Sequence, residues 1–169
     1  QLLGLLPLSD PARPDSRSMI EAARNLGIKS VMLTGDNLAI AKQIAAQVGI
    51  GSDIIKLADL KGVSDDERGE KIEKSNGLAE IYPEDKYRIV KILQSRGHRV
   101  GMTGDGVNDA PALKQAEMGI AVSNSTDVAK ASASVVLTEP GLGVIIDAVT
   151  ISRQTYQRML TWVINKVTK

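Results

Sequence analysis

The segment over residues 99–111, RVGMTGDGVNDAP, holds the densest set of side chains that could do chemistry. An apolar run at residues 100–102 breaks into a loop with two carboxylates, Asp105 and Asp109, the amide of Asn108 and two glycines. Glycines let the backbone approach a ligand, and two acids four residues apart supply oxygen ligands for a hard cation such as Mg²⁺. Capping of the following helix would explain one acid. The complete set favours metal binding.

A second copy of the Thr-Gly-Asp pattern follows an earlier apolar run, where residues 31–33 precede Thr34, Gly35 and Asp36. Ligands of open parallel sheets sit outside the carboxyl ends of the strands, so two such loops on neighbouring strands would share a crevice. The Thr34 hydroxyl and the Gly35 backbone N–H suit an anion there. Asp36 is interpreted equally well as part of this site or as the N-cap of the next helix.

Lys86 lies near the start of a helix, in the sequence PEDKY, just after a strand expected at residues 78–82. A solvated lysine is the simpler interpretation, but a side chain of this length also reaches the crevice, where Lys acts as a point cation against phosphate. Acids for Mg²⁺, a hydroxyl and amides for phosphoryl oxygens and a lysine for charge indicate phosphoryl transfer, which depends on positioning and electrostatics. The chain offers no activated nucleophile: its one histidine, His98, is interpreted as a surface residue.

Strands and helices alternate along the chain, which indicates an α/β fold with a largely parallel sheet. Ser64 with Glu67 predicts a capping box, and Asn76 with Gly77 predicts a turn. Residues 53–60 are expected to be irregular or extended. Strands are expected at residues 2–8, 30–33, 78–82, 100–102, 118–122 and 134–137, and helices at residues 15–26, 37–48, 64–75, 84–96, after 110, at 127–131 and from about 144 onward.

The composition excludes several classes of function. The length, 169 residues, suits one domain with an aliphatic core. A net charge of +1 and an aromatic content of 2 % argue against a nucleic-acid partner, which would need a basic surface or stacking platforms. Apolar stretches fall short of the ~20 residues that a membrane helix needs. Residues 2–6 are apolar and typical of a buried strand, and a natural domain rarely begins with one. We therefore expect this chain to be a piece of a longer one.

The two loops resemble the downstream signatures of P-type cation-pumping ATPases, in the sequences MLTGDN at residues 32–37 and MTGDGVNDAP at residues 102–111. The sequence DPAR at residues 10–13 resembles the Asp-Pro-Pro-Arg hinge of that family, and PEDK at residues 83–86 resembles the segment that carries its phosphate-contacting lysine. The resemblance covers essentially the whole chain. The sequences LTEPGL and SRQTYQRM near the end are most similar to the plasma-membrane proton-pump branch.

The resemblance implies a haloacid-dehalogenase-like, Rossmann-like phosphorylation domain, truncated here to its C-terminal part at residues 1–150. Residues 151–169 would begin the stalk that enters the fifth membrane helix, with residues 162–164 left exposed. The cofactors implied are ATP and Mg²⁺. Glu80 stands where some members carry an arginine near the nucleotide. The implied site residues are Asp105 and Asp109 for the metal, Thr34, Gly35, Asp36, Lys86 and Asn108 for catalysis, and Asp10 and Arg13 on the nucleotide side.

The family's phosphorylated aspartate lies in a D-K-T-G-T motif that this sequence lacks. The implied partners are therefore the remainder of the same pump, at the cytoplasmic face of a membrane: nucleophile strand, nucleotide-binding domain, actuator domain, membrane helices and transported cation. Without the central strand we expect an open sheet edge, which invites self-association, and no ATP turnover by this chain alone. Two alternatives stay open, a free-standing phosphatase of the same superfamily and a non-catalytic Mg²⁺-binding regulatory module.

Overall fold

Short parallel strands form two separate sheets in the computed structural model, which describes residues 11–168. The first has the order β1 (Met32–Leu33), β3 (Gly77–Ala79), β2 (Ile54–Lys56), and the second has the order β4 (Gly101–Gly104), β5 (Met118–Ala121), β6 (Val135–Val136). All pairings are parallel, which confirms the predicted α/β class. Within the described residues no backbone pairing joins β1 to β4, so the parallel strands do not form one continuous sheet. The strand expected at residues 2–8 lies outside the described residues.

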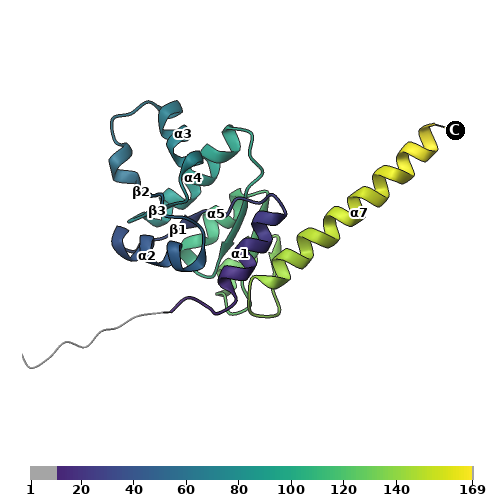
Figure 1. The fold of residues 1–169 in the computed structure, drawn as a ribbon, viewed down its shortest axis with the longest axis horizontal. Coiled ribbons are helices and arrows are strands. Elements are labelled where there is room, and N and C mark those ends of the chain that lie inside the picture. Colours follow the sequence, from purple (N-terminus) through teal and green to yellow (C-terminus); the bar gives the residue numbers. More distant parts are fainter. Residues whose placement is uncertain (1–10, 169) are drawn as a thin grey trace, which may run out of the picture.

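Helices connect the strands and pack around them (Figure 1). Their ends fall within one residue of the predicted bounds. Gly49 and Gly97, which follow α2 and α4, have φ of +80° and +88°, in the left-handed region that commonly ends helices. The helices are α1 (Ser16–Asn25), α2 (Leu38–Val48), α3 (Asp65–Lys74), α4 (Pro83–Ser95), α5 (Ala110–Gln115), α6 (Asp127–Ser132) and α7 (Gly143–Val167), with 3-10 turns η1 (Leu57–Leu60) and η2 (Val107–Asp109).

The turn predicted at Asn76 and Gly77 is wrong, because Gly77 is the first residue of β3. The Asn76 backbone N–H donates to the Asp53 carbonyl at 2.8 Å, and the Asn76 side chain accepts from the Asp53 N–H at 3.2 Å. A Cβ on Gly77 would lie 2.6 Å from the Met32 carbonyl oxygen, so this glycine permits close strand contact rather than a turn. The strand also ends at Ala79, three residues before the predicted end at residue 82.

The capping box predicted at the start of α3 forms only in part. Ser64 accepts the Glu67 backbone N–H at 3.2 Å, as predicted. The Glu67 carboxylate pairs instead with Lys71 at 2.9 Å, one turn further along the helix. Both groups are largely exposed, so a pair of this kind contributes little to stability.

Helix α4 packs against the cores of both sheets. Val90 belongs to a buried cluster with Met102 of β4 and Leu113 of α5, whereas Ile89 belongs to a cluster with Leu78 of β3. Leu33 of β1 also packs against both clusters. The two sheets are therefore joined by shared apolar packing, since the described residues supply no backbone pairing between them.

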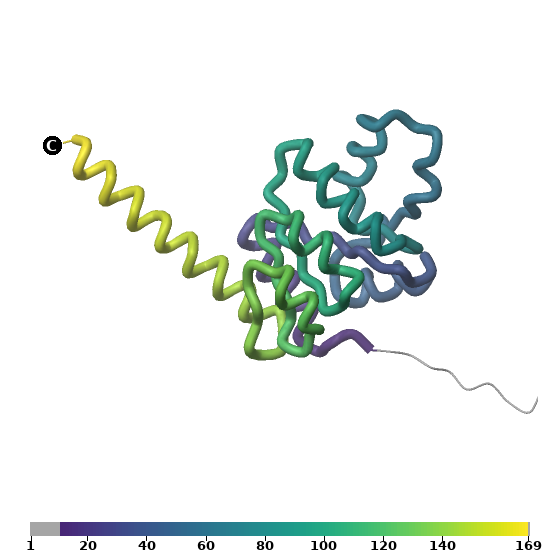
Figure 2. Tube along the Cα trace, turned by 180° about the vertical axis from the view of Figure 1, so that it is seen from behind, coloured from purple at the N-terminus to yellow at the C-terminus, as the bar shows by residue number. Residues whose placement is uncertain are grey.

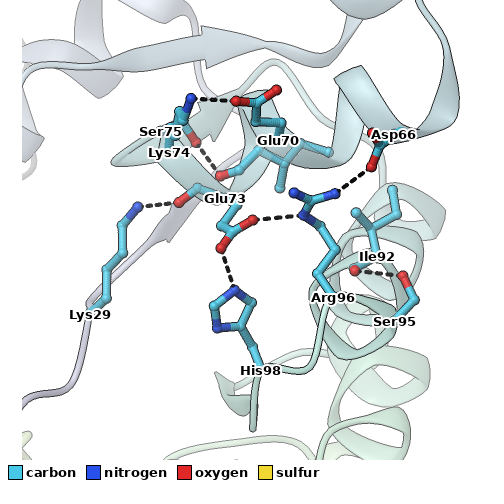
Figure 3. A network of polar contacts seen from close by, with 11 residues as sticks. Lys29, Asp66, Glu70, Glu73, Lys74, Ser75, Ile92, Ser95, Arg96 and His98 are labelled. Carbon is cyan, nitrogen blue, oxygen red and sulfur yellow. Dashed lines mark hydrogen bonds and ion pairs between the residues drawn. The ribbon is translucent and has the colours of Figure 1, made fainter.

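A polar network links α3 to the segments that precede β1 and β4 (Figure 3). The Glu73 carboxylate accepts from Arg96 Nε at 2.7 Å and lies 2.8 Å from His98 Nε2, while its carbonyl oxygen accepts from Lys29. Arg96 also donates to Asp66 at 2.8 Å. His98 is exposed, as expected, and has a specific partner in Glu73.

Helix α7 projects away from the rest of the structure (Figures 1 and 2). Its first turns lie near α1, where Arg153 donates to the Leu26 carbonyl at 2.5 Å. Among the described residues, no helix has both the length and the apolar character that a membrane span requires. The predicted exposure of residues 162–164 is confirmed, and the exposed apolar side chains of α7 are Ile151, Tyr156, Met159, Leu160, Trp162, Val163, Ile164 and Val167.

We expect Gly119→Ala to lower the free energy of unfolding by about 1–3 kcal/mol, the usual cost of overpacking. A Cβ on Gly119 in β5 would lie 2.2 Å from the Leu113 carbonyl oxygen, so α5 would have to move. Gly101→Ala in β4 is the matched control, because its Cβ would meet nothing closer than 3.8 Å. Urea denaturation at pH 7 makes the comparison, and equal stability of the two variants would contradict this packing.

The Glu73 network predicts a pH-dependent contribution to stability. The hydrogen bond from Arg96, and then that from His98, holds the pKa of Glu73 below its ordinary value. A carboxyl with a lowered folded-state pKa stabilises the fold above its ordinary pKa, and this stabilisation is lost as pH falls through the lowered value.

We therefore expect Glu73→Gln to reduce the melting temperature at pH 7, and the deficit to shrink as the pH falls below about 4. Glu70→Gln is the control, because among residues 11–168 Glu70 pairs only with Lys74, on the exposed face of the same helix. Thermal unfolding across pH 3–7 tests this, and a deficit that is constant with pH would rule out the ionised Glu73 as its source.

Candidate active site

The loop after β4 folds back on its own second acid. Asp109, at the end of η2, accepts the backbone N–H of Asp105 at 3.2 Å and that of Gly106 at 3.3 Å, both through Oδ2. A Cβ on Gly104 would lie 2.5 Å from the Cβ of Asp109, so the glycine leaves the space that this side chain fills. The loop geometry thus depends on Gly104 and Asp109 together.

Lys86 of α4 reaches this loop and pairs with the same acid. Its Nζ lies 2.6 Å from Asp109 Oδ1, and the Asp109 side chain is only 7 % exposed. Burial alone would raise the pKa of Asp109, but the hydrogen bonds from Lys86 and from the Gly106 and Asp105 amides outweigh it, so the pKa lies below its ordinary value. Asp109 is therefore an ionised carboxylate with donors on both oxygens.

Asp105 and Asn108 are exposed beside this pair. Within residues 11–168 no hydrogen bond or ion pair engages the Asp105 side chain, and no group of three or more His, Cys, Asp or Glu side chains could hold a metal. Mg²⁺ does not require all of its ligands from the protein. It commonly binds one or two carboxylates, and water and substrate phosphate complete its coordination shell. The free carboxylate of Asp105 fits such a cation. Asp109, the second predicted metal ligand, has Lys86 on one oxygen and two backbone amides on the other, and its role as a ligand stays a prediction.

The loop after β1 is held by its own hydrogen bonds. Thr34 Oγ1 donates to Asp36 Oδ2 at 2.7 Å and accepts the Asp36 backbone N–H at 3.1 Å. Interpretation of Asp36 as the N-cap of α2 is wrong, because Asn37 takes that position and accepts the Ala39 N–H at 2.9 Å. The Asp36 carboxylate is thereby left on the same loop as the Thr34 hydroxyl and the Gly35 N–H.

From the sequence we expected the two loops to follow neighbouring strands of one sheet. In the structure β1 and β4 belong to different sheets and do not pair. No hydrogen bond or ion pair joins residues 34–36 to residues 105–109 in the part of the chain that the structure describes. Leu33 at the end of β1 nevertheless packs against the apolar cluster that contains Met102 of β4. The strands therefore share a core without sharing backbone bonds.

Of the two residues expected on the nucleotide side, only Arg13 belongs to the described residues. Asp10 lies outside the described residues, and the exposed Arg13 forms no ion pair in the described part of the chain. A cavity of about 320 Å³ lies near residues 27–30, before β1, and none of the candidate site residues lines it.

Two residues that support the loops were not predicted from the sequence. The Thr126 backbone N–H, at the N-cap of α6, donates to the Asp105 carbonyl at 2.8 Å. Glu80 contacts the loop after β1 through its backbone and its side chain. The pattern TDVAK signals a helix start at Thr126, but no local pattern indicated the contacts of Glu80.

Comparisons with known proteins identify a family and several similar ATPases. The family described as haloacid dehalogenase-like hydrolase matches residues 1–117. A protein of Methanocaldococcus jannaschii, provisionally named as a cation-transporting ATPase, is 48 % identical over 172 residues, which cover 98 % of this chain and 21 % of that protein. The chain thus spans about a fifth of the length of this relative.

Solved structures of ATPases are also similar. A zinc-transporting PIB-type ATPase in its E2.Pi state has a TM-score of 0.71 at 32 % identity, over 90 % of this chain and 21 % of that one. The catalytic domain of the CPx-ATPase CopB-B has a TM-score of 0.64 at 28 % identity, over 83 % of this chain and 46 % of that one.

We expect Lys86→Met to lower the free energy of unfolding at pH 7 by about 1–3 kcal/mol, because it removes the charged partner of a buried carboxylate. The loss should diminish as the pH falls through the lowered pKa of Asp109, since that stabilisation exists only while Asp109 is ionised. Lys91→Met is the control: Lys91 lies on the same helix, with its ammonium 5.5 Å from the Tyr87 ring centroid. Denaturation curves at pH 7 and pH 3 test this, and equal losses in the two variants would contradict it.

Proposed function

Because the chain belongs to the haloacid dehalogenase-like hydrolase family, we propose that it is part of the phosphorylation domain of a P-type cation-transporting ATPase. Residues 1–150 are the C-terminal part of that domain, and residues 151–169 begin its stalk. The full protein transfers the terminal phosphoryl group of ATP to an aspartate outside this chain and hydrolyses the product to drive cation movement. The observation that carries the proposal is the convergence of Lys86, Asp105 and Asp109 at the carboxyl end of β4.

Each candidate residue has a distinct task in this proposal. Asp105 would hold Mg²⁺, and the metal would supply charge neutralisation at the phosphoryl oxygens. Asp109 holds Lys86 at the loop, and the lysine ammonium is placed to stabilise the same oxygens. Asn108 contributes an exposed amide beside them.

In this proposal the loop after β1, residues 34–36, binds the phosphoryl group. The Gly35 N–H and the Thr34 hydroxyl are our candidate donors for the phosphoryl group. In this structure the hydroxyl hydrogen goes to Asp36 Oδ2, so Thr34 donates to a phosphoryl oxygen only after it releases that contact, whereas the backbone N–H of Gly35 belongs to the loop itself. Preorganised donors of this kind stabilise the charge of a transferring phosphoryl group. Asp10 and Arg13 stay our candidates for the nucleotide side.

Partners and location follow from the same proposal. The chain works with the nucleophile strand, nucleotide-binding domain, actuator domain and membrane helices of the same protein, at the cytoplasmic face of a membrane. The relative from Methanocaldococcus jannaschii is named for cation transport and the solved PIB-type structure for zinc. Neither name supports the proton specificity that residues 137–142 and 152–159 suggested by resemblance, so we propose cation transport. Phosphoprotein formation assayed with Zn²⁺ and across pH tests the choice of ion.

We expect the full-length protein to form an acid-stable, hydroxylamine-labile phosphoprotein with radiolabelled ATP and Mg²⁺. Asp105→Asn should lower its formation by about 10²–10³-fold, the scale of losing one electrostatic contact to the transition state. Asp65→Asn is the control, because its side chain is 97 % exposed and, within the part of the chain that the structure describes, pairs only with Arg68 of its own helix.

Two outcomes would contradict the proposal. Full-length protein that forms no hydroxylamine-labile phosphoprotein would favour the non-catalytic, Mg²⁺-binding alternative. Turnover of ATP or of a simple phosphate ester by the 169-residue chain alone, abolished by Asp105→Ala, would indicate a free-standing phosphatase.

A further inference from the structure

Glu80 has a backbone conformation that its side chain does not explain. Its φ is +55°, and it is the one residue other than glycine with a positive φ among residues 11–168. Side chains with a Cβ carry a steric cost in the left-handed region, so such a residue persists only where its surroundings determine it. The residue follows β3 directly and lies three positions before Pro83, the first residue of α4.

The backbone at this position holds the loop after β1. The Glu80 N–H donates to the Asp36 carbonyl at 3.0 Å, and the Ile81 N–H donates to the Thr34 carbonyl at 3.2 Å. At residue 80 the backbone turns into the left-handed region and β3 ends. The N–H groups of Glu80 and Ile81 therefore face the loop after β1. The carbonyl groups on either side of Gly35 are thereby fixed to the end of β3.

The Glu80 side chain adds a second tie to the same loop. Its Oε1 accepts the Leu38 backbone N–H at 3.2 Å, at the start of α2, and pairs with Lys56 Nζ of β2 at 2.8 Å. The N-cap of α2 is already supplied by Asn37, so Glu80 is not needed for capping in the usual position. The bonds from Lys56 and then from the Leu38 amide hold the pKa of Glu80 below its ordinary value.

The segment that begins at Glu80 also leads to the other loop. It continues into α4, which presents Lys86 to Asp109 at 2.6 Å. The two loops share no hydrogen bond in the described part of the chain, so residues 80–86 form a covalent path between them. A shift at Glu80 would move residues 34–36 relative to Lys86.

We propose that Glu80 is a positioning residue for the proposed phosphoryl-binding loop, and that it sets residues 34–36 against Lys86 and the loop after β4. The inference rests on the proposed function, because it assigns a phosphoryl group to Thr34 and Gly35. Glu80 touches neither substrate nor metal in this proposal. It acts through the Asp36 carbonyl and the Leu38 amide.

Glu80→Gly separates positioning from stability. Glycine adopts the positive φ without strain, and this gain in the free energy of unfolding offsets the loss of the Glu80 side-chain contacts. The variant still lacks the side-chain hydrogen bond that anchors the loop after β1. Glu80→Gln keeps an acceptor for the Leu38 amide and serves as the conservative rescue. Lys74→Met is the matched control, because it breaks an exposed lysine–glutamate pair on α3, away from both loops.

In the full-length protein we expect Glu80→Gly to lower the kcat for phosphoprotein formation about tenfold, the effect of one lost hydrogen-bonded contact, with the KM for ATP unchanged. Inhibition by orthovanadate, a phosphate analogue, should weaken by a similar factor. Glu80→Gln should recover most of the rate, and Lys74→Met should match wild type. The melting temperature of Glu80→Gly should stay close to that of wild type.

If Glu80→Gly has the kcat and the vanadate sensitivity of wild type, this inference is wrong but the proposed function stands. The same holds if the rate falls only in proportion to the amount of folded protein. Failure of the wild-type protein to form any phosphoprotein would overturn the proposed function and the inference with it. Amide hydrogen exchange at Leu38 in the 169-residue chain gives a readout that needs no activity. Faster exchange in Glu80→Gly than in Glu80→Gln supports the anchoring contact, and equal exchange contradicts it.

Discussion

The contact between Lys86 and Asp109 is the interaction on which the candidate site depends. A buried carboxylate is costly unless donors surround it, and Asp109 has Lys86 on one oxygen and two backbone amides on the other. The pair therefore fixes the loop after β4 and the first turns of α4 at once. Because α4 also packs against the cores of both sheets through Ile89 and Val90, the position of the lysine is set by the whole apolar framework.

That framework is continuous in side chains but not in backbone. Leu33 of β1 packs against both apolar clusters, yet β1 pairs with β3 and β4 pairs with β5, and the described residues provide no pairing between β1 and β4. Each of these two strands therefore has one edge without a strand partner in the described part of the chain. An unpaired edge is a template for pairing with a further strand. The strand that carries the phosphorylated aspartate in our proposal would find such an edge here, and its presence in the functional unit stays a prediction.

The sequence was sufficient where local chemistry determined the structure. Helix bounds were predictable because residues such as Ser64 and Gly49 satisfy helix ends by short-range contacts, although the N-cap of α2 is Asn37 and not Asp36. It failed where a distant neighbour decided: Gly77 looks like a turn residue but is needed because Met32 of another strand lies against it. Glu80 has no local reason to adopt a positive φ, and only the loop formed by residues 34–36, more than forty positions earlier, explains it.

Gly104, the last residue of β4, and Gly106 in the loop that follows were indistinguishable in the sequence, and the structure assigns them different roles. Gly104 is required by packing, because a Cβ would lie 2.5 Å from the Cβ of Asp109. Gly106 has φ of −107°, which any residue adopts, and a Cβ there would meet nothing closer than 3.8 Å. Folding of the described residues thus gives no reason for glycine at 106. A small residue that the fold does not require, directly after Asp105, is what a loop needs when a ligand must approach its backbone.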